Sequence, residues 1–101
     1  MKQKTKKYLE SLEKDYPVFL NYLKAKFPLF HNSNFFFRDL HYGVKSYFEK
    51  KEMPLSYADA EEITEKLAEF FQEKEIFVWI NEKSWKVNYP EFVTTVPGDP
   101  F

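Results

Sequence analysis

The sequence contains no cysteine, only two glycines and no long apolar run. Without cysteine the chain can form neither a disulfide framework nor a thiolate metal site. No segment approaches the ~18 apolar residues that a membrane-spanning helix needs. The first 17 residues are rich in lysine and lack the apolar core of a signal peptide. We therefore expect a cytoplasmic protein with no membrane partner.

Residues that carry chemistry are also scarce. With only two glycines there is no glycine-rich loop to hold a phosphate. His31 and His41 are too few and too far apart in the sequence for a zinc site, and His41 is expected to be a hydrogen-bonded structural residue. No serine or other nucleophile has a recognisable local partner of the kind that nucleophilic catalysis requires. The sequence predicts no catalytic residues, no metal site and no cofactor, and hence no enzyme.

Aromatic residues are abundant, with 12 Phe, 7 Tyr and 2 Trp among 101 residues. Each ring covers about 150–250 Å² when it is buried, and a chain of this length forms one small core. Two interpretations stay open: the rings replace the scarce Val and Ile in the core, or some of them lie in an interface. The charge is asymmetric, because residues 1–55 have 11 basic and 6 acidic side chains whereas residues 56–101 have 4 and 10.

Apolar periodicity predicts three helices. The first covers residues 3–26, either as one helix bent at Pro17 or as two short helices with Asp15 capping the second. The second covers 35–51 and is capped by Ser33 or Asn34, with Gly43 allowing another element to approach closely. The third covers 57–74, and Ser56 is expected to cap it, with Asp59 in a capping box.

A β-hairpin is predicted after the third helix. Residues 76–80 and 84–89 form its strands, and a turn at 81–83 places Trp79 opposite Trp85. Because residues 76–80 are all apolar, this strand is expected to be the inner one and 84–89 the edge. Residues 29–31 are a candidate short strand. The prediction is a single domain over residues 1–89 followed by an extended C-terminal tail, 90–101.

The capped third helix and the hairpin, residues 55–89, resemble a winged helix, so that the expected fold is α+β, with three helices followed by a C-terminal β-hairpin. The resemblance is to a fold pattern and to no specific family. It implies either DNA binding through the third helix and the hairpin tip, or a role in protein docking.

The third helix favours docking, because its outward face is acidic. Six acidic residues and two lysines lie between Tyr57 and Lys74, which disfavours contact with phosphates. The face is either a solvent-exposed surface or a site for a basic partner, in which case the binding residues are Glu61, Glu62, Glu65 and Glu69.

Aromatic residues on the surface are the second candidate site. The sequence predicts interface roles for Phe35, Tyr42, Trp79 and Trp85, in contact with another protein or with a second copy in a homodimer. The function expected is a small, non-catalytic protein-interaction module. The alternative is a nucleic-acid-binding protein that uses the lysine-rich N-terminus and the second helix, through Lys4, Lys6, Lys7, Arg38 and Lys45.

Overall fold

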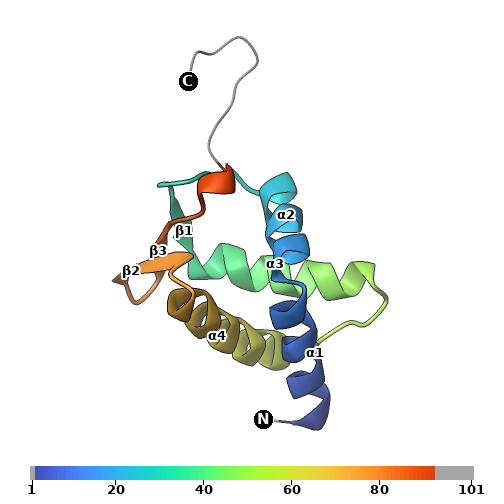
Figure 1. The fold of residues 1–101 in the computed structure, drawn as a ribbon. Helices are drawn as coiled ribbons and strands as arrows, with labels where there is room; N and C mark the ends of the chain where they lie inside the picture. Colours follow the sequence, from blue (N-terminus) through green and yellow to red (C-terminus); the bar gives the residue numbers. More distant parts are fainter. Residues whose placement is uncertain (1, 93–101) are drawn as a thin grey trace.

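The fold is α+β, with four α-helices and a three-stranded antiparallel sheet, in a computed structural model that describes residues 2–92. Figure 1 shows the sheet at one end of the molecule, beside the start of α3 and the end of α4. The elements in chain order are α1 (Gln3–Lys14), α2 (Tyr16–Lys26), β1 (Asn34–Phe36), α3 (Phe37–Lys50), α4 (Tyr57–Glu73), β2 (Phe77–Asn81), β3 (Ser84–Val87) and the short 3-10 helix η1 (Pro90–Phe92).

The first predicted helix is two helices, α1 and α2, which break at Asp15. Asp15 has φ −114° and ψ 41°, and its side chain makes no capping hydrogen bond. Its backbone N–H still donates to the carbonyl of Ser11, and its carbonyl accepts from Val18 and Phe19. Pro17 lies in the first turn of α2, where a missing N–H has no helical partner to lose. The two helices therefore follow one another along the same side of the molecule (Figure 1).

The start of the second predicted helix was wrong. Residues 34–36 form strand β1, and α3 begins only at Phe37 without a side-chain cap. Ser33 instead hydrogen-bonds the N–H and carbonyl of Phe30 in a local turn. No strand forms at residues 29–31 of the described chain, and the strand that precedes α3 is β1, which begins at residue 34.

Helix α4 matches its prediction closely. The Ser56 hydroxyl accepts a hydrogen bond from the Asp59 N–H at 3.1 Å, which satisfies one of the free donors at the helix start. The inward side of the helix is buried through Ala60, Ile63, Thr64, Leu67 and Phe71. The Thr64 hydroxyl donates to the Ala60 carbonyl, so this buried polar side chain is satisfied.

The hairpin has the predicted register, but the predicted strand order was wrong. Trp79 lies opposite Trp85 and Phe77 opposite Val87, as expected. The sheet order is β1-β3-β2, so β3 is the central strand and β2 is an edge. The apolar run therefore does not mark the inner strand here. A register shift lies between Trp79 and Asn81, where the Asn81 side chain accepts hydrogen bonds from the Lys83 N–H and the Ser84 hydroxyl.

Most of the aromatic rings pack together in the core, which supports the first interpretation of their number. Fifteen of the twenty aromatic residues in the described range are buried or half-buried. The five exposed ones are Phe30, Phe36, Tyr42, Tyr57 and Trp79. Gly43 is buried on α3, and a Cβ at this position would collide with Leu23 Cδ2 of α2. The close approach predicted at this glycine is therefore confirmed.

The packed body extends beyond the predicted boundary at Tyr89. Phe92 is buried, and its carbonyl accepts a hydrogen bond from the His31 N–H at 2.9 Å. Lys24 lies over the Phe92 ring at 4.8 Å from its centroid. The rest of the predicted tail, residues 93–101, lies outside the described residues.

Candidate functional site

The acidic face of α4 is formed as the sequence predicts. Glu61, Glu65 and Glu69 are exposed, whereas Glu62 is half-buried. One lysine lies among them: Lys66 Nζ is 3.9 Å from a Glu69 carboxylate oxygen. This contact takes the place of the Glu62–Lys66 pair that i,i+4 spacing suggests. The face therefore keeps most of its negative charge, and no other ion pair is found on it within residues 2–92.

Helix α1 covers the side of α4 next to this face. Lys2 forms an ion pair with Asp59 at 3.3 Å, and the Tyr16 ring packs edge-on against Phe70 and Phe71. The two helices thus lie side by side with their N-termini at the same end. Burial raises the pKa of the Glu13 carboxyl, and the negative charges of Glu10 and Glu73 raise it further. Glu13 therefore lies close enough to Glu10 and Glu73 for their charges to act on it.

The four predicted interface aromatics divide into two groups. Phe35 and Trp85 lie opposite each other in β1 and β3 and are 2% and 3% exposed, so neither is on the surface. Phe35 was predicted to lie on the outer side of a helix but lies in strand β1. Trp85 was a candidate interface residue on the condition that the helices leave it uncovered, and it is buried. Tyr42 and Trp79 are 59% and 60% exposed and stay available to a partner.

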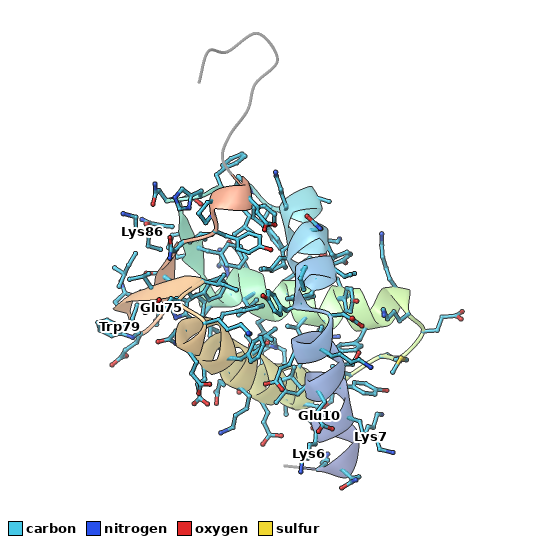
Figure 2. The ribbon with its side chains drawn as sticks, viewed as in Figure 1. Lys6, Lys7, Glu10, Glu75, Trp79 and Lys86 are labelled. Carbon is cyan, nitrogen blue, oxygen red and sulfur yellow. The ribbon has the colours of Figure 1, made fainter. Side chains whose placement is uncertain are left out.

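Trp79 belongs to an apolar surface on the edge strand. We use the term β2 surface for Val78, Trp79 and Ile80 together with Phe36 of β1, all of which are exposed. The tip of the hairpin carries a hollow of about 670 Å³ between Phe36, Trp79 and Lys83. A second hollow, of about 470 Å³, lies on the other side of Trp79, beside Gln72 and Glu75. Figure 2 shows Glu75 and Trp79 together at this end of the molecule.

Sequence reasoning missed three residues of the β2 surface. Phe36 falls within the helix predicted over 35–51, and residues 76–80 were predicted to be the inner strand of the hairpin. A run of this kind is usually buried, so only the pairing of β1 with β3 reveals that the strand lies at an edge. No signal within 76–80 could have corrected the prediction, because the run lacks the proline and charge that commonly mark an edge strand.

The basic residues of the nucleic-acid alternative do not form one patch. Arg38 and Lys45 share a hollow of about 260 Å³ with His41, Tyr42 and Tyr57. The N-terminal lysines lie elsewhere: Tyr8 stacks on Phe48, which is ten residues along α3 from Arg38, or about 15 Å of helix. Figure 2 places Lys6 and Lys7 at the opposite end of the molecule from Trp79.

Both histidines have structural partners. His31 Nδ1 accepts a hydrogen bond from the Tyr89 N–H at 3.0 Å. His41 Nε2 lies 3.3 Å from the Tyr57 carbonyl, and the two rings meet edge to face. Across residues 2–92 no three His, Asp or Glu side chains gather in a way that would hold a metal ion.

Helices of the described chain are too short or too polar to cross a membrane. The search of family models, the search of curated proteins and the search of solved structures each found no match to this chain.

Proposed function

We propose that this chain is a non-catalytic protein-docking module of the winged-helix type. Its docking surfaces are the β2 surface and the acidic face of α4. The observation that carries the proposal is the run of three exposed apolar residues, Val78, Trp79 and Ile80, on an edge strand. Successive side chains of a strand point to opposite faces, so these residues leave apolar surface exposed on both faces of the edge strand. Exposed apolar surface that gathers in one place is typical of interaction sites, whereas isolated exposed apolar side chains are common on any surface.

The order of the elements supports the winged-helix arrangement. A helical region, a short strand, two helices and a hairpin follow one another along the chain. In this arrangement α1 and α2 together correspond to the first helix, and β2 and β3 form the wing. The short strand β1 pairs with β3 and so joins the first half of the chain to the hairpin.

The charge of α4 favours a protein over duplex DNA as the partner. A helix that enters a DNA groove needs basic side chains to neutralise phosphates. Here Glu61, Glu65 and Glu69 are exposed instead. This face, like the β2 surface, would therefore bind another protein, and the residues of that protein in contact with it would be basic.

Photo-crosslinking in cells tests the proposal. A photoreactive amino acid at position 65 or 78 should form covalent adducts with protein, and the same residue at exposed Asn21 on α2 should not. Adducts from position 21 alone would contradict the proposal.

Duplex binding distinguishes the alternative function. In a fluorescence anisotropy titration, the purified chain should not bind a labelled duplex. Micromolar binding that weakens steeply between about 50 and 200 mM salt would instead support the nucleic-acid alternative. Replacing Lys4, Lys6 and Lys7 with Glu should then abolish that binding.

A further inference from the structure

Two hollows meet at Arg38, at the start of α3. The one that we call the Phe37 hollow, of about 440 Å³, is lined by Phe36, Phe37, Arg38 and Lys83. The one that we call the Lys45 hollow, of about 260 Å³, is lined by Arg38, His41, Tyr42, Lys45 and Tyr57. Because Arg38 lines both, the two hollows are neighbours on the surface around the first half of α3.

The charged residues that line these two hollows are all basic. They are Arg38, Lys45 and Lys83. Each of the two hollows beside Trp79 includes a glutamate instead. The two ion pairs found within residues 2–92 involve none of the three cations. Their charges therefore remain available to an anionic ligand.

Carboxylates lie near these hollows but line neither of them. Four lie next to a lining residue in the sequence or one helical turn from it: Asp39, Glu49, Glu61 and Glu82. They weaken the attraction that an anion feels at a distance, and salt screens what remains. Charge alone therefore does not make this a binding site, and a ligand held here has to gain part of its affinity from other contacts.

Exposed aromatic rings supply those contacts. Tyr42 is 59% exposed and lies one helical turn from each of the two lining cations on α3. Lys26 Nζ lies 5.6 Å from the centroid of the Tyr42 ring, which adds a further cation beside the Lys45 hollow. Tyr57 is 66% exposed, and its ring meets His41 edge to face with the centroids 4.5 Å apart. The Lys45 hollow therefore presents two exposed rings beside its cations.

The same combination of ring and cation occurs in both hollows. The Phe37 hollow has the exposed ring of Phe36 together with Arg38 and Lys83. A single-stranded nucleic acid repeats a base and a phosphate in each nucleotide, and proteins bind such strands by stacking the bases on aromatic rings along a basic groove. In a duplex the bases are stacked on one another and do not reach such rings. A phosphorylated tyrosine has one ring and one phosphate and would fill one hollow only.

We infer that the two hollows together form a binding site for single-stranded nucleic acid. One base stacks on Tyr42 or Tyr57 in the Lys45 hollow, another base lies in the Phe37 hollow, and Arg38 contacts the phosphate between them. The two lysines of the lining contact the phosphates on either side. This site goes beyond the docking function, which does not depend on it, and it needs none of the N-terminal lysines of the duplex-binding alternative.

Fluorescence anisotropy with a labelled single strand of about ten nucleotides tests the inference on the full chain. At about 50 mM salt the strand should bind with a dissociation constant of about 1–100 µM, and the matching duplex should not bind in this range. Three phosphate contacts predict that the logarithm of the association constant falls against the logarithm of the salt concentration with a slope of about −2. AMP should compete poorly, because a mononucleotide fills one hollow only.

Two substitutions separate the contribution of charge from that of stacking. Arg38→Gln should weaken binding about fivefold to tenfold at this salt concentration and reduce the slope by about 0.7. Tyr42→Leu should weaken binding about fivefold or more and leave the slope unchanged. Tyr42→Phe keeps the ring and should bind like the original chain. A purely structural role for Tyr42 would not produce this difference in slope.

Matched controls establish that these effects are local. Lys7→Gln removes the same charge at an exposed position on α1 and should leave binding unchanged. Circular dichroism and the melting temperature establish that each variant is folded. In an NMR titration with the strand, amide shifts should change at residues 36–45 and at Tyr57, and not on the acidic face of α4. Arg38→Gln should also leave photo-crosslinking from positions 65 and 78 unchanged, so that the two functions are tested separately.

Several outcomes would overturn the inference. These are a strand that does not bind at low salt, a duplex that binds as tightly as the strand, or equal losses in Lys7→Gln and Arg38→Gln. AMP that competes as strongly as the unlabelled strand would assign the site to a single nucleotide instead. A phosphotyrosine peptide that binds more tightly than the strand would assign it to a phosphorylated protein. None of these results would contradict the docking function of the other two surfaces.

Discussion

Trp79 and Trp85 lie directly opposite each other in the hairpin, yet one is 60% exposed and the other 3%. Both side chains point to the same face of the sheet, because directly opposed residues share a face. Trp85 on the central strand stacks on Phe77, with ring centroids 5.0 Å apart, and also meets Phe37. Trp79 lies on the edge strand and extends past the helices. Whether a strand is central or at the edge of the sheet therefore decides whether its tryptophan is buried or exposed.

Truncating these two tryptophans should have very different effects. Trp85→Ala should lower the free energy of unfolding by about 3–5 kcal/mol, because it empties a buried site. Trp79→Ala should change it by about 0.5 kcal/mol or less in the monomer. Urea unfolding at low micromolar concentration measures both. Equal losses in the two variants would mean that the edge strand is covered.

The pairing of the tryptophans was predictable from the sequence, but their burial was not. Turn residues and alternating side chains fix the register of a hairpin locally. Which strand is central depends on β1, three residues that follow a turn near Asn32, where φ is 69°. The Val87 N–H donates to the Ser33 carbonyl and the Val87 carbonyl accepts from the Asn32 N–H. These bonds join segments more than fifty residues apart, and no local pattern encodes them. The apolar run was consequently placed at the wrong position in the sheet.

Sequence patterns gave correct predictions where the feature depends on a single helix. Ser56 caps α4, the glutamates of α4 face outward, and Gly43 admits Leu23. They failed at Phe35 and Phe36, where helical periodicity continued backward into a strand. Of the candidate site, the sequence therefore predicted the acidic face and Trp79 but not the rest of the β2 surface.

The effect of Gly43→Ala on stability should reverse in sign when Leu23 is truncated to alanine. Gly43→Ala alone should destabilise the chain by about 1 kcal/mol, because overpacking against buried Leu23 outweighs the gain in helix propensity. In a Leu23→Ala background, which itself should cost about 2–5 kcal/mol, the added methyl has room. Gly43→Ala should then stabilise the chain by up to about 1 kcal/mol. A double-mutant cycle in urea measures the coupling, and additive effects would contradict the close contact.

Glu65→Lys should stabilise the chain slightly, because it replaces two repulsive contacts on α4 with attractive ones. Glu61 and Glu69 lie one helical turn on either side, and pairs at this spacing are each worth about 0.2–0.5 kcal/mol. The gain should shrink at high salt, and Glu65→Gln should give a smaller gain. Thermal unfolding at two ionic strengths provides the measurement. A substantial loss of stability would show that this face is packed against something.

Glu13→Gln should raise the stability of the chain at neutral pH and have no effect in acid. Burial, followed by repulsion from Glu10 and Glu73, raises the pKa of the Glu13 carboxyl above its ordinary value of 4.5. The folded state then holds this proton more tightly than the unfolded state does, so the contribution to stability is present below pH 4.5 and is lost as pH rises through the raised pKa. Glutamine cannot ionise and avoids that loss. Melting temperatures should be measured from pH 3.5 to 7 for the original chain and for Glu13→Gln, and the two curves should converge in acid. Glu82→Gln, at an exposed position, is the control. A constant difference across this range would mean that the introduced glutamine side chain acts through packing and not through charge.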